Sequence, residues 1–421
     1  MTCLLAVTFC GSAQLRGILD RAKQKTANKA SEKVDKTIDK TTDPASGKTE
    51  KPATEGENKA AENNDAGGKA KPATDTVKNE PASFKTYSKY DFVPGEKVIG
   101  FEDFSTGSIG DFPAGWNTNG SGEIVTIEGK PGRWLWITKP GVFVPEFTKS
   151  YPEDFTFEFD LLHGVPITGA DFKFSFVELP DIEQPQNWTL SPNRLTIGLY
   201  TSNSDQVNGA TTSEIRKNSG SQAANQTYTE ILSDKFNPIH VSVWRQKERV
   251  RVYINQEKFW DIPKAIAPDA KLNAILFAPL YAEANLQHYI GNLRLAIGAP
   301  DTRKKMLEQN KWVTHGILFD VNSDNIKPES YGTLKEMANV LKEFADLKVK
   351  IVGHTDADGK DADNLDLSKR RAAAVKAALA KEFGIDESRM ETDGKGESEP
   401  IDKNDNPAGK ANNRRVEFIK I

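Results

Sequence analysis

The sequence predicts a multidomain fold in which a disordered N-terminal segment precedes an all-β sandwich and then an α/β domain. Three observations predict this order. Residues 14–83 contain no Phe, Trp or Tyr, whereas residues 84–300 repeatedly alternate apolar and polar side chains. From residue 301 to residue 421, helical and strand periods follow one another. A chain of 421 residues is long enough for two or three such domains.

The composition excludes several classes of function. The chain has 56 Lys and Arg against 60 Asp and Glu, for a net charge of −4. Because no surplus of positive charge is available for a phosphate backbone, we expect no nucleic-acid partner. Both cysteines, Cys3 and Cys10, lie in the first ten residues, and the five histidines are scattered. We therefore expect no metal site, no disulfide framework and no cofactor.

Residues 1–13 are predicted to be a signal peptide. An apolar core at 3–10 is followed by small residues, which favours cleavage after Ala13. Two alternatives stay open. In the first, Cys10 is acylated as in a lipoprotein, although Phe9 is large for that motif, and in the second the apolar N-terminus has no targeting role. The basic residues usual before the apolar core are missing, which is typical of a truncated start. Residues 14–83 then form a disordered tether, because a segment this polar cannot bury enough apolar surface to offset the entropy of ordering it.

The middle segment, residues 84–300, is predicted to form an antiparallel β-sandwich. Four runs alternate apolar and polar residues, beginning at Phe155, Phe172, Ile239 and Val250. A membrane barrel also alternates, but its strands need about 9–11 residues. The clean alternations here span about six or seven residues, so the sandwich is favoured and the barrel is kept as an alternative.

Residues 101–116, 134–138, 155–161 and 251–263 loosely resemble concanavalin A-like, laminin G-type jelly rolls. The resemblance implies a jelly-roll fold, which laminarinase-type glycoside hydrolases share. Their catalytic strand carries alternate acidic residues. Here Glu158 and Asp160 match, but His163 replaces the third acid, so we predict a protein that is not an enzyme. The two carboxylates are predicted to lie on the solvent face of a strand.

Tryptophans are a second candidate feature of the sandwich. They could stack on sugars or pack in the core, and core packing is the commoner fate. The six concerned are Trp116, Trp134, Trp136, Trp188, Trp244 and Trp260. We predict that the sandwich binds a glycan or an envelope protein.

The C-terminal segment, residues 301–421, predicts one sheet with helices on one side. Strands are expected at 317–320, 349–352 and 416–421, and helices around 334–344 and at 364–383.

The second helix carries an unusual arginine. With Val375 at the centre of the buried face and about 100° per residue, Arg371 falls about 40° away, on the apolar stripe. A guanidinium there is costly unless an anion meets it. Asp356 follows the second strand, at the sheet edge where α/β folds bind ligands. An internal Asp356–Arg371 ion pair is the alternative.

Four motifs in this segment closely resemble the OmpA-like peptidoglycan-binding family. They are ILFDVNSDNIKPES at 317–330, GHTDADG at 353–359, NLDLSKRRAAAV at 364–375 and GKANNRRVE at 409–417. The resemblance implies that Asp356 pairs with the ammonium of diaminopimelate in the peptidoglycan stem peptide. It also implies that Arg371 binds the carboxylate of the same group through two parallel hydrogen bonds. Replacing either residue is expected to abolish binding.

The resemblance implies supporting roles for four more residues. Asn364 and Thr355 are expected to orient the loop, Arg414 to add a second donor, and Asp320 to line one wall. Relatives usually carry an aromatic residue where this chain has Lys395, which puts one wall of the site in doubt.

Together these features predict an exported protein of the periplasm, associated with the outer membrane, that binds peptidoglycan non-covalently through residues 301–421. Two alternatives are a glycan-acting hydrolase docked on the cell wall and an outer-membrane barrel with a periplasmic wall-binding domain.

Overall fold

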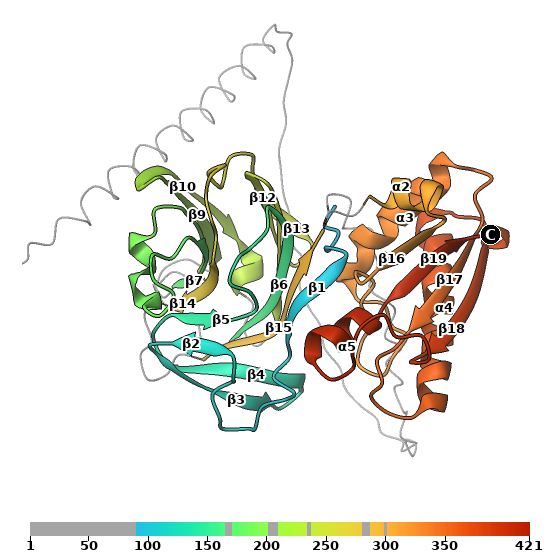
Figure 1. Ribbon diagram of the computed structural model, residues 1–421, viewed down its shortest axis with the longest axis horizontal. Helices are drawn as coiled ribbons and strands as arrows, with labels where there is room; N and C mark the ends of the chain where they lie inside the picture. The colour runs from blue at the N-terminus through green and yellow to red at the C-terminus, as the bar shows by residue number, and fades with distance from the viewer. Residues whose placement is uncertain (1–89, 165–170, 201–208, 234–236, 280–286, 299–300) are drawn as a thin grey trace, which may run out of the picture. The chain divides into compact units, whose positions relative to one another are not determined.

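A computed structural model describes residues 90–164, 171–200, 209–233, 237–279, 287–298 and 301–421 (Figure 1). The described residues belong to one compact unit. The predicted signal peptide and tether, residues 1–83, lie outside the described residues, as does the start of the predicted sandwich. None of the helices in the described ranges is both long and apolar enough to cross a membrane.

The first large sheet is antiparallel and contains eight described strands. They are β1 (Lys97–Glu102), β3 (Ser121–Ile127), β4 (Lys130–Lys139), β6 (Asp154–His163), β11 (Ile239–Gln246), β12 (Arg249–Ile254), β13 (Glu257–Ile262) and β15 (His288–Ile297). Their order is β13-β12-β11-β6-β15-β4-β3, and β1 pairs with β15. Strand β15 therefore lies beside β6 along one edge and beside β4 and β1 along the other.

The second large sheet is also antiparallel and contains seven described strands. In order they are β10 (Gly220–Thr229), β9 (Gly209–Lys217), β8 (Arg194–Tyr200), β7 (Asp171–Val177), β14 (Ala274–Pro279), β5 (Phe143–Pro145) and β2 (Trp116–Thr118). Two 3-10 turns, η2 (Pro185–Leu190) and η3 (Glu230–Ser233), accompany it. The two sheets confirm the predicted all-β segment, while the jelly-roll topology stays a prediction.

The period-two runs form the core between these sheets, as predicted. Phe157 and Phe159 of β6 pack against Phe174, Phe176 and Phe277 of the opposite sheet, with ring centroids 5.0–6.2 Å apart. All five rings are almost completely inaccessible to solvent. Alternation predicts the inward faces because successive side chains of a strand point to opposite sides of its sheet.

The prediction that Glu158 and Asp160 lie on a solvent face is wrong. Only 3% of Glu158 is exposed, and Asp160 is half-buried. The outer face of the first sheet is covered, because Tyr90 and Phe92 pack on Tyr253 of β12. Alternation identifies which side chains share a face, but it does not tell whether a later segment covers that face.

The C-terminal α/β segment has one four-stranded sheet in the order β16-β19-β17-β18. Its strands are β16 (Lys311–Thr314), β17 (Val349–His354), β18 (Met390–Gly396) and β19 (Val416–Lys420). Its helices are α2 (Thr302–Glu308), α3 (Tyr331–Glu343), α4 (Asp361–Phe383) and α5 (Pro407–Asn413), with the 3-10 turns η4 (Pro328–Ser330) and η5 (Glu387–Arg389). The predicted strands near 349 and 416 and both predicted helices are present.

The predicted strand at 317–320 is wrong. The first strand of this sheet is β16, and residues 317–320 leave it, making one isolated bridge from Phe319 to Ile326. The backbone of Leu318 is instead held by the Ser330 hydroxyl, which accepts from its N–H at 2.8 Å. Local side-chain hydrogen bonding therefore replaces the sheet ladder that the apolar run predicted.

Two glycines let α4 lie directly on the sheet. A Cβ on Gly353 of β17 would meet the backbone oxygen of Ser368 at 2.3 Å, and one on Gly394 of β18 would meet the backbone nitrogen of Lys369 at 2.4 Å. Helix α4 buries Ser368, Val375 and Leu379 against the sheet at this contact.

We expect Gly353→Ala to lower the free energy of unfolding by about 1–3 kcal/mol, because neither backbone can move aside without disturbing the packed helix. Urea denaturation measures this. Ala373→Ser, on the exposed side of α4, is the matched control and should change the stability by less than about 0.5 kcal/mol. Equal effects from the two variants would contradict close packing at Gly353.

Candidate functional site

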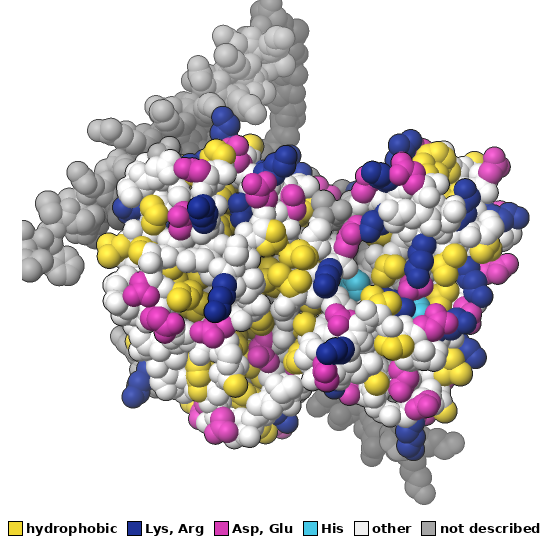
Figure 2. Space-filling model, viewed as in Figure 1, with side chains coloured by type: hydrophobic (Ala, Val, Ile, Leu, Met, Phe, Trp, Pro, Cys, Tyr) yellow, Lys and Arg dark blue, Asp and Glu magenta, His cyan; other side chains and the backbone are white. Residues whose placement is uncertain are grey.

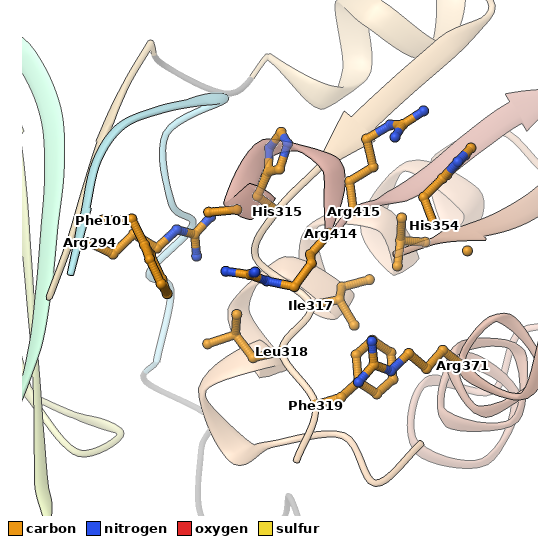
Figure 3. A pocket seen from close by; sticks show the side chains of 13 residues that line it. Phe101, Arg294, His315, Ile317, Leu318, Phe319, His354, Arg371, Arg414 and Arg415 are labelled. Atoms are coloured by element: carbon orange, nitrogen blue, oxygen red, sulfur yellow. The ribbon is translucent and has the colours of Figure 1, made fainter. Parts of the chain in front are cut away.

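A pocket rich in arginine lies where the ends of β17 and β19 meet α4 and α5 (Figure 3). Its lining residues are Phe101, Arg294, His315, Ile317, Leu318, Phe319, Gly353, His354, Arg371, Ala411, Arg414, Arg415 and Val416. Of the six residues that the sequence singled out, Arg371 and Arg414 line this pocket. Figure 3 shows Arg414 extending between Arg294 and Phe101 on one side and Arg371 on the other.

Arg371 is half-buried on α4 and meets carbonyl groups and a ring. Its Nε donates to the carbonyl of Ser323 at 2.9 Å, and its guanidinium carbon lies 4.8 Å from the ring centroid of Phe319. Burial, and then the neighbouring charge of Arg414, lower the pKa of Arg371 to about 10, so it stays protonated at neutral pH. Within the described ranges no carboxylate forms an ion pair with it, so the predicted alternative of an internal Asp356–Arg371 pair is not observed.

Asp356 pairs with Arg414 instead. Only 8% of Asp356 is exposed, and its Oδ2 accepts from Nη1 of Arg414. Arg414 also lies over the ring of Phe101, 5.0 Å from its centroid. The charges of Asp356 and Arg414 both act on Arg371, so the three groups are close neighbours. Arg414 therefore bridges the anion and the second cation of the site.

Asn364 and Thr355 are buried behind this pair. The side-chain amide of Asn364 donates to the carbonyl of Asp358 at 3.0 Å and to Glu397 Oε2 at 2.5 Å, across the loop that carries Asp356. The backbone N–H of Thr355 donates to Gly396, at 2.9 Å. The Asn364 side chain thus contacts the loop, whereas Thr355 contributes only its backbone, and its hydroxyl has no hydrogen-bond partner among the described residues. The orienting roles of both residues stay predictions.

Asp320 and Lys395 lie away from the pocket lining. Asp320 is exposed, and its backbone carbonyl rather than its side chain accepts from Nη2 of Arg371 at 3.4 Å. Lys395 lies near Asp393 and Glu399, at 3.6 and 3.7 Å. The wall predicted for Asp320 is made by its neighbour Phe319, which belongs to the same motif but was not among the predicted site residues.

Two lining residues come from the sandwich and carried no sequence signal for this site. Phe101 lies on β1 and Arg294 on β15. Arg294 is 6% exposed and lies 3.5 Å from Glu158, which also faces His240 at 3.4 Å. The acidic pair of the hydrolase hypothesis is thus engaged by basic side chains on a covered face.

A buried ion network supports the base of the pocket. Glu417 of β19 accepts from Nε of Arg415 at 2.8 Å and lies 2.7 Å from Nζ of Lys311. His354 Nε2 lies 3.6 Å from the same carboxylate. Burial alone would raise the pKa of Glu417, but the contacts with His354 and Lys311 and the charge of Arg415 outweigh it and hold the pKa well below 4.5.

The four arginines of the pocket differ in their ion pairs. Arg294, Arg414 and Arg415 each have a carboxylate partner, whereas Arg371 has none among the residues described. Elsewhere basic and acidic side chains are interspersed over the visible face (Figure 2). The described ranges hold no cluster of His, Cys, Asp and Glu that could bind a metal ion. The arrangement suits an anion, because a guanidinium binds a carboxylate through two parallel hydrogen bonds.

The tryptophans of the sandwich do not form one platform. Trp116 stacks on Phe277 in the core, Trp188 belongs to a separate buried cluster, and Trp136 stacks on Tyr289. Trp134 is buried, and Trp244 and Trp260 are half-buried on other strands. Core packing explains the fully buried members.

Comparison with known proteins concerns the C-terminal segment. A model described as the OmpA family matches residues 318–414. Outer membrane porin F of Pseudomonas fluorescens is 44% identical over 101 residues, which are 24% of this chain and 31% of that protein. The probable lipoprotein YiaD of Escherichia coli (strain K12) is 42% identical over 104 residues, 25% of this chain and 47% of that protein. The chain thus spans less than half the length of these two relatives.

Among solved structures, the peptidoglycan-associated lipoprotein from Burkholderia pseudomallei is 26% identical, with a TM-score of 0.25. The match covers 29% of this chain and 98% of that one.

Proposed function

We propose that the C-terminal domain, which belongs to the OmpA family over residues 318–414, binds peptidoglycan non-covalently and anchors the chain to it. The observation that carries the proposal is the half-buried guanidinium of Arg371. It lines the pocket, stays charged at neutral pH and lacks a carboxylate partner among the residues described. The contacts of this guanidinium within the described ranges are carbonyl groups and a ring, and a half-buried cation of this kind is stabilised when an anionic ligand binds beside it.

The ligand group we propose is the side-chain end of diaminopimelate in the stem peptide. This group carries one ammonium and one carboxylate on the same carbon, so it needs an anion and a cation held close together. Asp356 would accept a hydrogen bond from the ammonium, while Arg371 would donate two parallel hydrogen bonds to the carboxylate. Arg414 already holds one oxygen of Asp356, which fixes that carboxylate and adds a second donor at the pocket.

The relatives confirm the predicted location, because they are outer-membrane proteins and lipoproteins. The chain is a protein of the periplasm, associated with the outer membrane. For the sandwich, we propose a glycan or an envelope protein as the partner. The hydrolase alternative is not favoured by the contacts of its carboxylates, since Asp160 lies 2.6 Å from His240 Nδ1 and Glu158 faces Arg294.

Co-sedimentation of the full chain with purified sacculi tests this function. We expect wild type to pellet with sacculi that contain diaminopimelate and to be released by a soluble stem peptide that contains it. Sacculi with lysine at that position lack the side-chain carboxylate, so they should retain at least tenfold less protein. Equal pelleting with both kinds of sacculi would refute the diaminopimelate assignment, and no pelleting with either would refute peptidoglycan binding.

A further inference from the structure

We propose that the sandwich completes the peptidoglycan pocket, with Arg294 and Phe101 contributing a subsite for a second carboxylate of the same peptide. The inference rests on the proposed function. It concerns residues outside the matched range 318–414 and a part of the ligand beyond the diaminopimelate side chain.

Arg294 has unused hydrogen-bonding capacity. Only 6% of Arg294 is exposed to solvent. Neither Nη1 nor Nη2 has a hydrogen-bond partner in the described part of the chain. Its ion-pair partner, Glu158, lies 3.5 Å away and also faces His240. Glu158 Oε1, which faces Nη1, also has no hydrogen-bond partner among the described residues, so the ion pair accounts for Nη1 and leaves Nη2 as the unsatisfied donor. Buried donors are almost always satisfied in native structures, so Nη2 of this pocket-lining residue can take an acceptor from a ligand.

An irregularity in β15 turns Arg294 toward the pocket. The pairing of β15 with β6 shifts between Gly291 and Arg294, and Asn292 there has a φ of 52°. After this bulge, Leu293 and Leu295 point into the sandwich core, so Arg294 between them points to the opposite face. Bulges re-aim side chains in this way near functional sites.

The sandwich is held against the pocket by specific contacts. The side-chain amide of Asn412 on α5 accepts from the N–H of Val98 and donates to its carbonyl, both at 2.9 Å. Val98 and Ala296 also form a buried apolar cluster with Ala411 of α5, and Phe101 packs against it. These contacts keep Phe101 and Arg294 in place before any ligand arrives.

A peptide with several carboxylates matches this row of arginines. Arg414 extends between Arg294 and Arg371 (Figure 3), so an anion at Arg294 is separated from one at Arg371 by a third guanidinium. Besides its diaminopimelate side chain, a stem peptide carries the α-carboxylate of D-glutamate and a C-terminal carboxylate. The ring of Phe101 lies against Arg414, with its centroid 5.0 Å from the guanidinium carbon, and so contributes an apolar wall beside this subsite.

Calorimetric titration of the full chain with the tripeptide L-alanyl-γ-D-glutamyl-meso-diaminopimelate tests the subsite. Two analogues replace either the D-glutamate α-carboxylate or the C-terminal carboxylate by an amide. We expect one amide to bind wild type about tenfold more weakly than the free acid. Arg294→Gln should bind the free acid about tenfold more weakly and should no longer distinguish that amide from the acid. The variant and the amide each remove one partner of the same contact, so together they form a double-mutant cycle that isolates the interaction of Arg294 with that carboxylate.

Matched variants and the ligand series separate the possible outcomes. Arg249→Gln, at an exposed arginine of the sandwich paired with Asp261, should behave as wild type. If wild type binds both amides as tightly as the acid, the inference fails while peptidoglycan binding stands. Weak binding by Arg294→Gln with the discrimination retained would make Arg294 a structural residue and would also overturn the inference. Failure of wild type to bind either the tripeptide or sacculi would overturn both proposals.

Discussion

Arg371→Ala and Asp356→Ala should each weaken binding of the full chain to sacculi by about 30-fold or more. Removing one partner of a buried, hydrogen-bonded charge pair costs about 2–5 kcal/mol, much of it from the charge left behind. Arg371 lines the pocket and Asp356 is 8% exposed, so neither role can be taken over by bulk water. Co-sedimentation at a series of sacculus concentrations measures the apparent affinity.

The adjacent arginine is the matched control. Arg370 is exposed and pairs with Asp324 at 2.6 Å and Asp366 at 2.8 Å on the outer side of α4. Arg370→Ala removes the same charge from the neighbouring position and should bind as wild type does. Arg371→Lys adds a test of geometry, because a lysine keeps the charge but cannot make two parallel hydrogen bonds. Equal loss in Arg370→Ala and Arg371→Ala would reduce the role of Arg371 to general charge attraction.

Glu417→Gln should lower the free energy of unfolding by about 3–5 kcal/mol, the usual cost of leaving a buried ion unpaired. The side chains of Glu417 and Arg415 are 3% and 2% exposed. Glutamine preserves the shape of the side chain but leaves Arg415 without its counter-charge. Chemical denaturation of the full chain measures the change. Glu343→Gln breaks an exposed ion pair with Arg303 and should cost less than about 1 kcal/mol.

The same carboxylate predicts a direction for the pH dependence of stability. The pKa of Glu417 is held well below its ordinary value of 4.5 in the folded protein. Its contribution is therefore complete above about pH 4.5 and is lost as the pH falls from there toward the folded pKa. In Glu417→Gln this part of the acid destabilisation should disappear. An unchanged slope between wild type and variant below that pH would show that other groups control acid unfolding.

Local pattern predicted four strands of the sandwich core and the two longest helices of the C-terminal segment. The core strands were predictable because alternation at Phe155–Leu161 directly reports a strand with one buried face. Helix α4 was predictable because Val375, Leu379 and Ser368 recur at helical spacing. The strand at 317–320 was mispredicted because an apolar run also fits a segment that packs against a core without joining the sheet. Ile317 is buried in just this way.

The amino-acid sequence alone predicted the resemblance of the C-terminal segment to the OmpA family, which the family model matches over residues 318–414, and it selected Asp356 and Arg371 as candidate site residues, because the motifs around them are short and local. Three features could be seen only in the folded chain: Asp356 pairs with Arg414, Glu158 is buried, and Phe101 and Arg294 reach the same pocket. These facts depend on contacts between distant segments, such as Val98 with Asn412, 314 residues apart. No local period encodes such a contact, because it forms only when segments far apart in the sequence pack together.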